Sequence, residues 1–212
     1  IRDRSPSRGL GDVYKRQVNG AIDAAQLTTK GGITSGQHLV LTKGLGTGVI
    51  LAAHMQGRAR GEYVDGAIQS MLISNRYAVP LMGVHGVTAA TDVTGFGLAG
   101  HLSEMLRASK VSARLNLDVV PLLPGALELM DGGFKSSLHD GNDRSVAGIE
   151  ESQHPHFRML FDPQTAGGLL LSVAPDQSES LCSGLILAGY EDVAVIGEVV
   201  GREKMAIMFD GP

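Results

Sequence analysis

The chain has 212 residues, of which 43% are hydrophobic and 19% are charged, as is usual for a globular protein. Its 18 basic and 22 acidic side chains give a net charge of −4, which excludes the basic surface typical of nucleic-acid-binding proteins. The sequence has no apolar run long enough to span a membrane, and its single cysteine excludes an intramolecular disulfide, so we expect a cytoplasmic protein with no membrane partner.

The first segment differs from the rest of the chain. Residues 1–17 are basic, contain proline and glycine, and have neither helical nor strand periodicity. We expect a disordered or non-native leader there, and a single domain over residues 18–212.

Within that domain, apolar runs alternate with segments of helical periodicity. Strands are predicted at 38–43, in a short run up to Asp92, and at 112–117, 168–174, 192–200 and 205–209. Helices are predicted from the Gly46-Thr-Gly48 turn to Met55, from Tyr63 to about Ala78, where Pro80 ends the helix, and at 95–109, 124–130 and 176–188. Residues 131–153 are polar and predict an exposed loop. This pattern predicts an α+β fold with helices on a small mixed sheet.

The stretch from Thr91 to His101 reads Thr-Asp-Val-Thr-Gly-Phe-Gly-Leu-Ala-Gly-His, an acidic residue followed by a glycine-rich turn and a helix. Unpaired N–H groups and the helix dipole attract phosphate oxygens to a helix N-terminus, and Gly95 and Gly97 lack the Cβ atoms that would obstruct a ligand. Asp92 offers a carboxylate oxygen of the kind that Mg²⁺ prefers. The spacing alone leaves another interpretation open, with Thr94 as an N-cap, glycines that allow close packing, and Asp92 as a turn residue.

This stretch resembles the signature of selenophosphate synthetase, also called selenide, water dikinase. The resemblance extends from Val18 to the end of the chain and corresponds to the C-terminal half of that family. Further matching segments follow the family's order: Leu39–Lys43 with Leu45–Gly48, Ser70–Asn75, Ser136–His139 with Asn142, and Phe161–Leu169. The resemblance implies a domain like the C-terminal domain of aminoimidazole ribonucleotide synthetase.

In the reaction that the resemblance implies, ATP, selenide and water give selenophosphate, AMP and phosphate, with Mg²⁺ as cofactor. Asp92 would then bind Mg²⁺ on the ATP phosphates, and Thr91, Thr94, Gly95 and Gly97 would shape the adjoining part of the site. The family's catalytic cysteine or selenocysteine, its lysine and its N-terminal ATP-binding domain lie upstream and have no counterpart here. We therefore expect no catalytic residue in this chain, no activity from it alone, and a homodimer only for the full-length enzyme.

Two other functions remain open at this stage. The chain could belong to another ATP-using enzyme of the aminoimidazole ribonucleotide synthetase-like superfamily, such as thiamine monophosphate kinase. It could also be a non-catalytic dimerising or regulatory module.

Other candidate sites are weaker. The glycines at 44, 46 and 48 match neither a Walker A nor a Rossmann pattern and indicate a flexible strand-to-helix turn. Residues 139–143 lack the spacing of a calcium loop, and His154 and His156 have no evident third metal ligand. Cys182 lies among leucines at helical spacing, which favours a buried apolar role over a reactive thiol.

Overall fold

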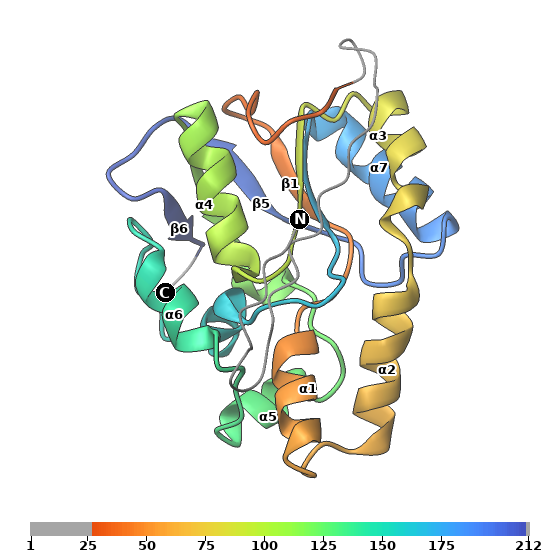
Figure 1. The fold of residues 1–212 in the computed structure, drawn as a ribbon. Helices are drawn as coiled ribbons and strands as arrows, with labels where there is room; N and C mark the ends of the chain where they lie inside the picture. The colour runs from red at the N-terminus through yellow and green to blue at the C-terminus, as the bar shows by residue number, and fades with distance from the viewer. Residues whose placement is uncertain (1–26, 211–212) are drawn as a thin grey trace, which may run out of the picture.

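Six strands form one mixed sheet in the computed structural model, which describes residues 27–210 (Figure 1). They are β1 (His38–Leu41), β2 (Ala89–Asp92), β3 (Ser112–Leu115), β4 (Leu169–Val173), β5 (Ala194–Val200) and β6 (Ile207–Phe209). Their order is β2-β4-β1-β5-β3-β6, and all neighbours are antiparallel except β3 and β6, which are parallel. The predicted α+β fold with a small mixed sheet is confirmed. The leader predicted at residues 1–17, and the predicted start of the domain at residue 18, lie outside the described residues.

The helices of the described residues match most of the predicted ones to within a few residues. The α-helices are α1 (Thr47–Met55), α2 (Gly61–Leu72), α3 (Val79–Val84), α4 (Gly97–Ser109), α5 (Ala126–Asp131), α6 (His139–Ser145) and α7 (Pro175–Leu187). Three 3₁₀-helices accompany them: η2 (Asn75–Tyr77), η3 (Leu117–Val119) and η4 (Pro155–Phe161). Within residues 27–210, none of the helices has the length and apolar character needed to cross a membrane.

Helices cover both faces of the sheet because successive side chains of a strand point to opposite faces. Leu39 and Leu41 of β1 share a core cluster with Leu102 of α4, whereas Val40 shares another with Leu181 of α7. A third cluster joins α1, α2 and α5, which Figure 1 shows below the strands. The helix that follows β2 is thus fixed against the sheet along its length.

The single helix predicted from Tyr63 to Ala78 is wrong. The chain leaves the helical path after Leu72, and α3 starts anew at Val79 with Pro80 in its first turn. A proline is compatible with a first helical turn because its missing N–H would have no helical partner there. Pro80 therefore begins a helix and does not end one.

The exposed loop predicted at 131–153 is also partly wrong, because it contains α6. His139 and Asn142 of this helix are buried. Polar side chains such as these are expected to be exposed to solvent, but each has a hydrogen-bond partner inside the protein. His139 Nε2 lies 2.9 Å from the carbonyl oxygen of Arg158, and Asn142 binds two carbonyl groups described below. Buried polar groups that are paired in this way are compatible with a core.

Candidate functional site

Asp92 ends β2 at the edge of the sheet, opposite Leu169 of β4. It is exposed and lines a groove of about 500 Å³. The remaining lining residues belong to the segment before β1, to η2 and α3, and to β2 and β4: Thr28, Thr29, Lys30, Asn75, Arg76, Val79, Met82, Ala90, Thr91 and Leu169. The groove is therefore lined both by the predicted metal-binding carboxylate and by two basic residues, Lys30 and Arg76.

The turn after Asp92 is held by backbone hydrogen bonds to a second loop. The N–H of Val93 donates to the carbonyl oxygen of Gly168 at 2.8 Å, and the N–H of Gln164 donates to that of Thr94 at 2.9 Å. Asn142 Nδ2 donates to the carbonyl oxygens of Gly95, at 2.9 Å, and Phe161, at 3.0 Å. Asn142, which the sequence left without a role, thus ties α6 to the turn.

The two glycines of the turn have different surroundings. Gly97 has a φ of 68°, and a Cβ atom there would lie 2.7 Å from the carbonyl oxygen of Leu160. Gly95 has no atom within 4 Å of the position that a Cβ would take. Gly97 is therefore required by backbone conformation and by packing against η4, whereas the space beside Gly95 is open to a ligand.

Phe96 is the N-cap residue of α4, so the interpretation of Thr94 as the N-cap is wrong. The N-cap side chain accepts no hydrogen bond from the first turn of this helix. The hydroxyl of Thr94 instead lies 3.2 Å from Nε2 of His101, one turn into α4, and that of Thr91 donates to the carbonyl oxygen of Asp92 at 3.3 Å. The N-terminus of α4 thus keeps its attraction for anions.

His101 is buried beside this turn, and its Nδ1 has no hydrogen-bond partner among the described residues. Burial lowers the pKa of His101, while the negative charges of Asp92 and Glu104 raise it by smaller amounts. The imidazole is therefore mainly neutral near pH 7, since its ordinary pKa already lies below that value. We expect it to orient Thr94 and to add no positive charge to the site.

A second glycine-rich turn, at residues 44–48, is occupied by side chains of the protein itself. Gln164 Oε1 accepts hydrogen bonds from the N–H groups of Gly46, at 3.0 Å, and Thr47, at 3.2 Å. Asp162 Oδ2 accepts one from the N–H of Gly48 at 3.1 Å. Burial raises the pKa of Asp162 to about 6, although hydrogen bonds from the Val49 backbone and Gln164 oppose this rise. The flexible turn predicted here is a closed structural element.

Lys43 is buried just after β1 and joins the loop that contains Ala166 to the end of α2. Its Nζ donates to the carbonyl oxygens of Ser70, at 3.0 Å, Ile73, at 2.7 Å, and Ala166, at 3.0 Å. Burial lowers the pKa of the ammonium group. The carbonyls of Ser70 and Ile73 lie at the C-terminal end of α2, where helical acceptors lack the usual N–H partner four residues later, so Lys43 has a structural role.

The other candidate sites of the sequence are not supported as metal centres. In residues 27–210, no three histidine, cysteine or acidic side chains gather in a way that could hold a metal. His154 Nε2 lies 3.0 Å from Asp118, and His156 Nδ1 lies 2.8 Å from the carbonyl oxygen of Leu117. Cys182 packs against the core cluster of α7, and burial raises the pKa of its thiol, as expected for an unreactive side chain.

The segments that carried the family resemblance converge on the loop 161–169. Hydrogen bonds reach it from the turn after Asp92, from the turn at 44–48, from Lys43 and from Asn142. Asn75 Nδ2 also donates to the carbonyl oxygen of Gly167, at 2.9 Å. The sequence analysis did not predict this role of the loop. The motif Asp-Pro-Gln-Thr-Ala-Gly-Gly, which is part of the family resemblance, was the feature that could have indicated it.

Comparison with known proteins gives the family. Residues 34–210 match the family described as AIR synthase related protein, C-terminal domain. The chain belongs to this family. The match covers all six strands and α1 to α7.

The predicted resemblance is confirmed by named relatives. The chain is 37% identical over 202 residues to a selenide, water dikinase of Bdellovibrio bacteriovorus and 40% identical over 194 residues to one of Pelobacter propionicus. The alignments cover 91% and 88% of this chain but only 56% and 55% of those relatives, in their C-terminal parts. The chain thus spans little more than half the length of the relatives that it matches.

Solved structures of lower identity share the fold. The hydrogenase maturation protein HypE of E. coli superimposes with a TM-score of 0.66 at 18% identity, over 91% of this chain and 51% of HypE. A HypE structure in complex with ATP gives 0.59 at 14% identity, over 89% of this chain and 51% of that one. At such identities the likeness establishes the architecture alone.

Proposed function

We propose that this chain is the C-terminal part of a cytoplasmic, homodimeric selenide, water dikinase that makes selenophosphate from ATP and selenide with Mg²⁺. The observation that carries the proposal is the exposed Asp92, which lines a groove at the end of an edge strand, three residues before the open space beside Gly95. The reaction is inferred from the name of the relatives, and the exposed position of Asp92 would allow this residue to bind the metal ion that the reaction uses.

The residues at this site fit one part of a magnesium centre. Mg²⁺ takes one or two protein carboxylates and completes its shell with waters and phosphate oxygens, so a lone aspartate is a sufficient contribution. When bound, the ion would supply neutralisation of phosphate charge during phosphoryl transfer. Asp92 would hold it, while the uncapped start of α4 and the open face of Gly95 would receive phosphate oxygens.

Thr91, Thr94 and Gly97 act on the shape of the site in this proposal. Thr91 is buried beside Asp92, Thr94 is held by His101 and by the loop 161–169, and Gly97 allows α4 to begin against η4. Within residues 27–210 no further metal-binding cluster exists, so the remaining ligands would come from the N-terminal half that the relatives possess. The proposal therefore includes the expectation that the chain alone does not turn over ATP with selenide.

Complementation tests the proposal. The chain is coexpressed with the N-terminal part of the Pelobacter propionicus relative, and selenophosphate is measured by phosphorus NMR in the presence of ATP, Mg²⁺ and selenide. We expect activity from the pair, none from the chain alone, and a loss of at least about 100-fold in the Asp92→Asn variant, because a bound metal contributes several kcal/mol to charge stabilisation. Asp65→Asn, on the exposed face of α2, is the matched control and should keep full activity.

A binding measurement on the chain alone gives a second test. With ¹⁵N-labelled protein, Mn²⁺-ATP should broaden amide signals of residues 92–97 in the parent chain and in Asp65→Asn, but not in Asp92→Asn. Selenide-independent ATP use by the complemented pair would favour another enzyme of the superfamily. Activity that survives Asp92→Asn would leave the chain as a non-catalytic module and refute the proposal.

A further inference from the structure

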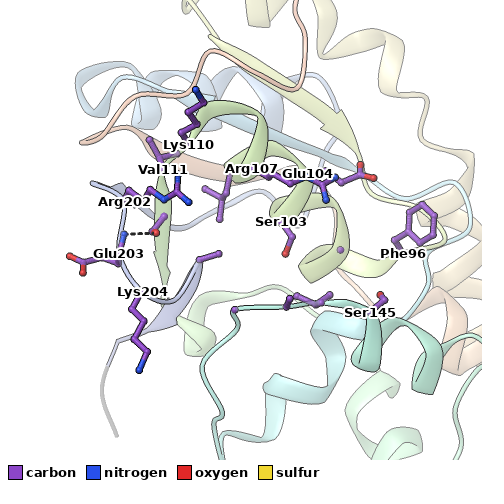
Figure 2. A pocket seen from close by; sticks show the side chains of 17 residues that line it. Phe96, Ser103, Glu104, Arg107, Lys110, Val111, Ser145, Arg202, Glu203 and Lys204 are labelled. Atoms are coloured by element: carbon purple, nitrogen blue, oxygen red, sulfur yellow. Dashed lines mark hydrogen bonds between the residues drawn. The ribbon is translucent and has the colours of Figure 1, made fainter.

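A second groove of about 500 Å³ lies beside α4 (Figure 2). It is bounded by α4, by residues 145–148 at and after the end of α6, and by the loop 201–206 between β5 and β6. None of its lining residues lines the groove of Asp92. Its volume lies in the range typical of sites for small molecules.

Basic side chains predominate around this groove, although the whole chain has a net charge of −4. Four of its lining residues are basic and two are acidic: Arg107, Lys110, Arg202, Lys204, Glu104 and Glu203. Glu104 is already paired with Lys30, whereas none of the four basic residues forms an ion pair with another described residue.

The position of α4 explains only half of this charge. Arg107 and Lys110 lie at the C-terminal end of the helix, where they offset its partial negative charge. Arg202 and Lys204 belong to a different segment, in which no helix needs such compensation. These two residues give the groove an excess of positive charge, and the N–H of Glu203 between them is fixed by a 2.9 Å hydrogen bond to the hydroxyl of Ser112.

The groove also contains a buried hydroxyl without a partner. The Oγ atom of Ser103 is inaccessible to solvent and forms no hydrogen bond with the described residues. Figure 2 shows the side chain directed from α4 toward the segment that carries Ser145. A helical serine commonly donates to the carbonyl four residues earlier, so this hydroxyl lacks even the usual local partner. Because solvent does not reach this atom, a ligand in the groove would not contact it either, and such a ligand would meet the basic side chains instead.

We propose that this groove binds a small, multiply charged phosphate anion, which contacts Arg202 and Lys204 from one side and Arg107 and Lys110 from the other. Arginine and lysine are the usual cationic partners of phosphate oxygens. The site is independent of the proposed dikinase activity, since it requires neither Asp92 nor a metal ion.

Calorimetric titration of the 212-residue chain with pyrophosphate tests the site. EDTA is present throughout, so that metal-dependent binding at Asp92 does not contribute. We expect binding that weakens as the salt concentration rises, and a loss of roughly 5- to 20-fold in affinity for the double variant Arg202→Ala/Lys204→Ala, because two partly solvated charge contacts are removed. Arg58→Ala, which replaces an exposed arginine between α1 and α2, is the control and should bind as the parent does.

Ser103→Ala is a second control. Its Oγ has no partner and is inaccessible to solvent, so the substitution should change neither the melting temperature nor the affinity for pyrophosphate. A second titration with ADP distinguishes the two possible sources of the phosphate. Tighter binding of ADP indicates a nucleotide ligand, and tighter binding of pyrophosphate indicates a free polyphosphate. The proposal is overturned if pyrophosphate and ADP both fail to bind at millimolar concentration. It is equally overturned if the double variant binds as the parent does, or if only Arg76→Ala, in the groove of Asp92, weakens binding.

Discussion

Replacing Gly97 with alanine would introduce a Cβ atom 2.7 Å from the carbonyl oxygen of Leu160 and 2.9 Å from the carbonyl carbon of Phe161. Both contacts are to backbone, which cannot move aside as the end of a flexible side chain can. The φ of 68° adds a cost of about 1 to 2 kcal/mol, since it is a left-handed conformation that alanine avoids. Together with an overpacking cost of about 1 to 3 kcal/mol, the variant should lose about 3 kcal/mol of unfolding free energy.

Gly95→Ala is the matched control, because the added Cβ meets nothing within 4 Å. Its stability should stay within about 1 kcal/mol of the parent and can rise slightly, since alanine restricts the unfolded chain. For a domain of this size a loss of 3 kcal/mol lowers the melting temperature by roughly 6 to 12 °C. Thermal and urea unfolding followed by circular dichroism measure both, as the chain has no tryptophan for fluorescence. Equal melting temperatures for the two variants would refute the assignment of Gly97 to packing.

Three further predictions concern buried polar groups. The raised pKa of Asp162 means that the folded state binds a proton at this carboxyl more tightly than the unfolded chain does. This residue should therefore lower the free energy of unfolding by up to about 3 kcal/mol as the pH rises from 3.8 to about 6. Urea unfolding across this range should show a smaller decline for Asp162→Asn, and parallel curves for variant and parent would contradict the raised pKa. Lys43→Met removes three hydrogen bonds to carbonyl groups and should lower the free energy of unfolding in urea by roughly 2 to 4 kcal/mol. The control Lys135→Met breaks only an exposed ion pair and should cost at most about 1 kcal/mol. Similar losses for the two variants would argue against the structural role of Lys43. Asn142→Ala leaves two carbonyl groups without their donor and should cost about 1 to 3 kcal/mol in thermal unfolding, so an unchanged melting temperature would count against this tie.

The strands and most helices could be predicted from the sequence because their signals are local. Short apolar runs mark β1 and β5, and the glycine-rich turn marks the start of α4 within two residues. Pro80 was misread because a proline that ends one helix and a proline that starts the next look alike without tertiary context. The helix α6 was missed because its polar residues are buried through hydrogen bonds to distant segments, which no local pattern reveals.

For the candidate site, the sequence identified the stretch from Thr91 to Gly97, and the structure exposes Asp92 as that prediction required. The different roles of Gly95 and Gly97 could not be predicted, since they depend on where the backbone of η4 lies. His101 lies ten residues after Thr91, but its contact with Thr94 depends on the path of the turn and first turn of α4. The assignment of these residues to nucleotide and metal binding stays a prediction.

The arrangement at the start of α1 has a consequence for ligand selectivity. Strand-to-helix turns rich in glycine present amide groups that an oxyanion can occupy, and here the carboxylate of Asp162 takes that place from within the fold. A phosphate from solution therefore finds no anion-binding site at this turn, and the turn does not compete with the start of α4 for phosphate. The substitution Asp162→Gly would leave the amide groups of this turn without the carboxylate. Formate or acetate in the buffer could take its place and should restore part of the lost stability.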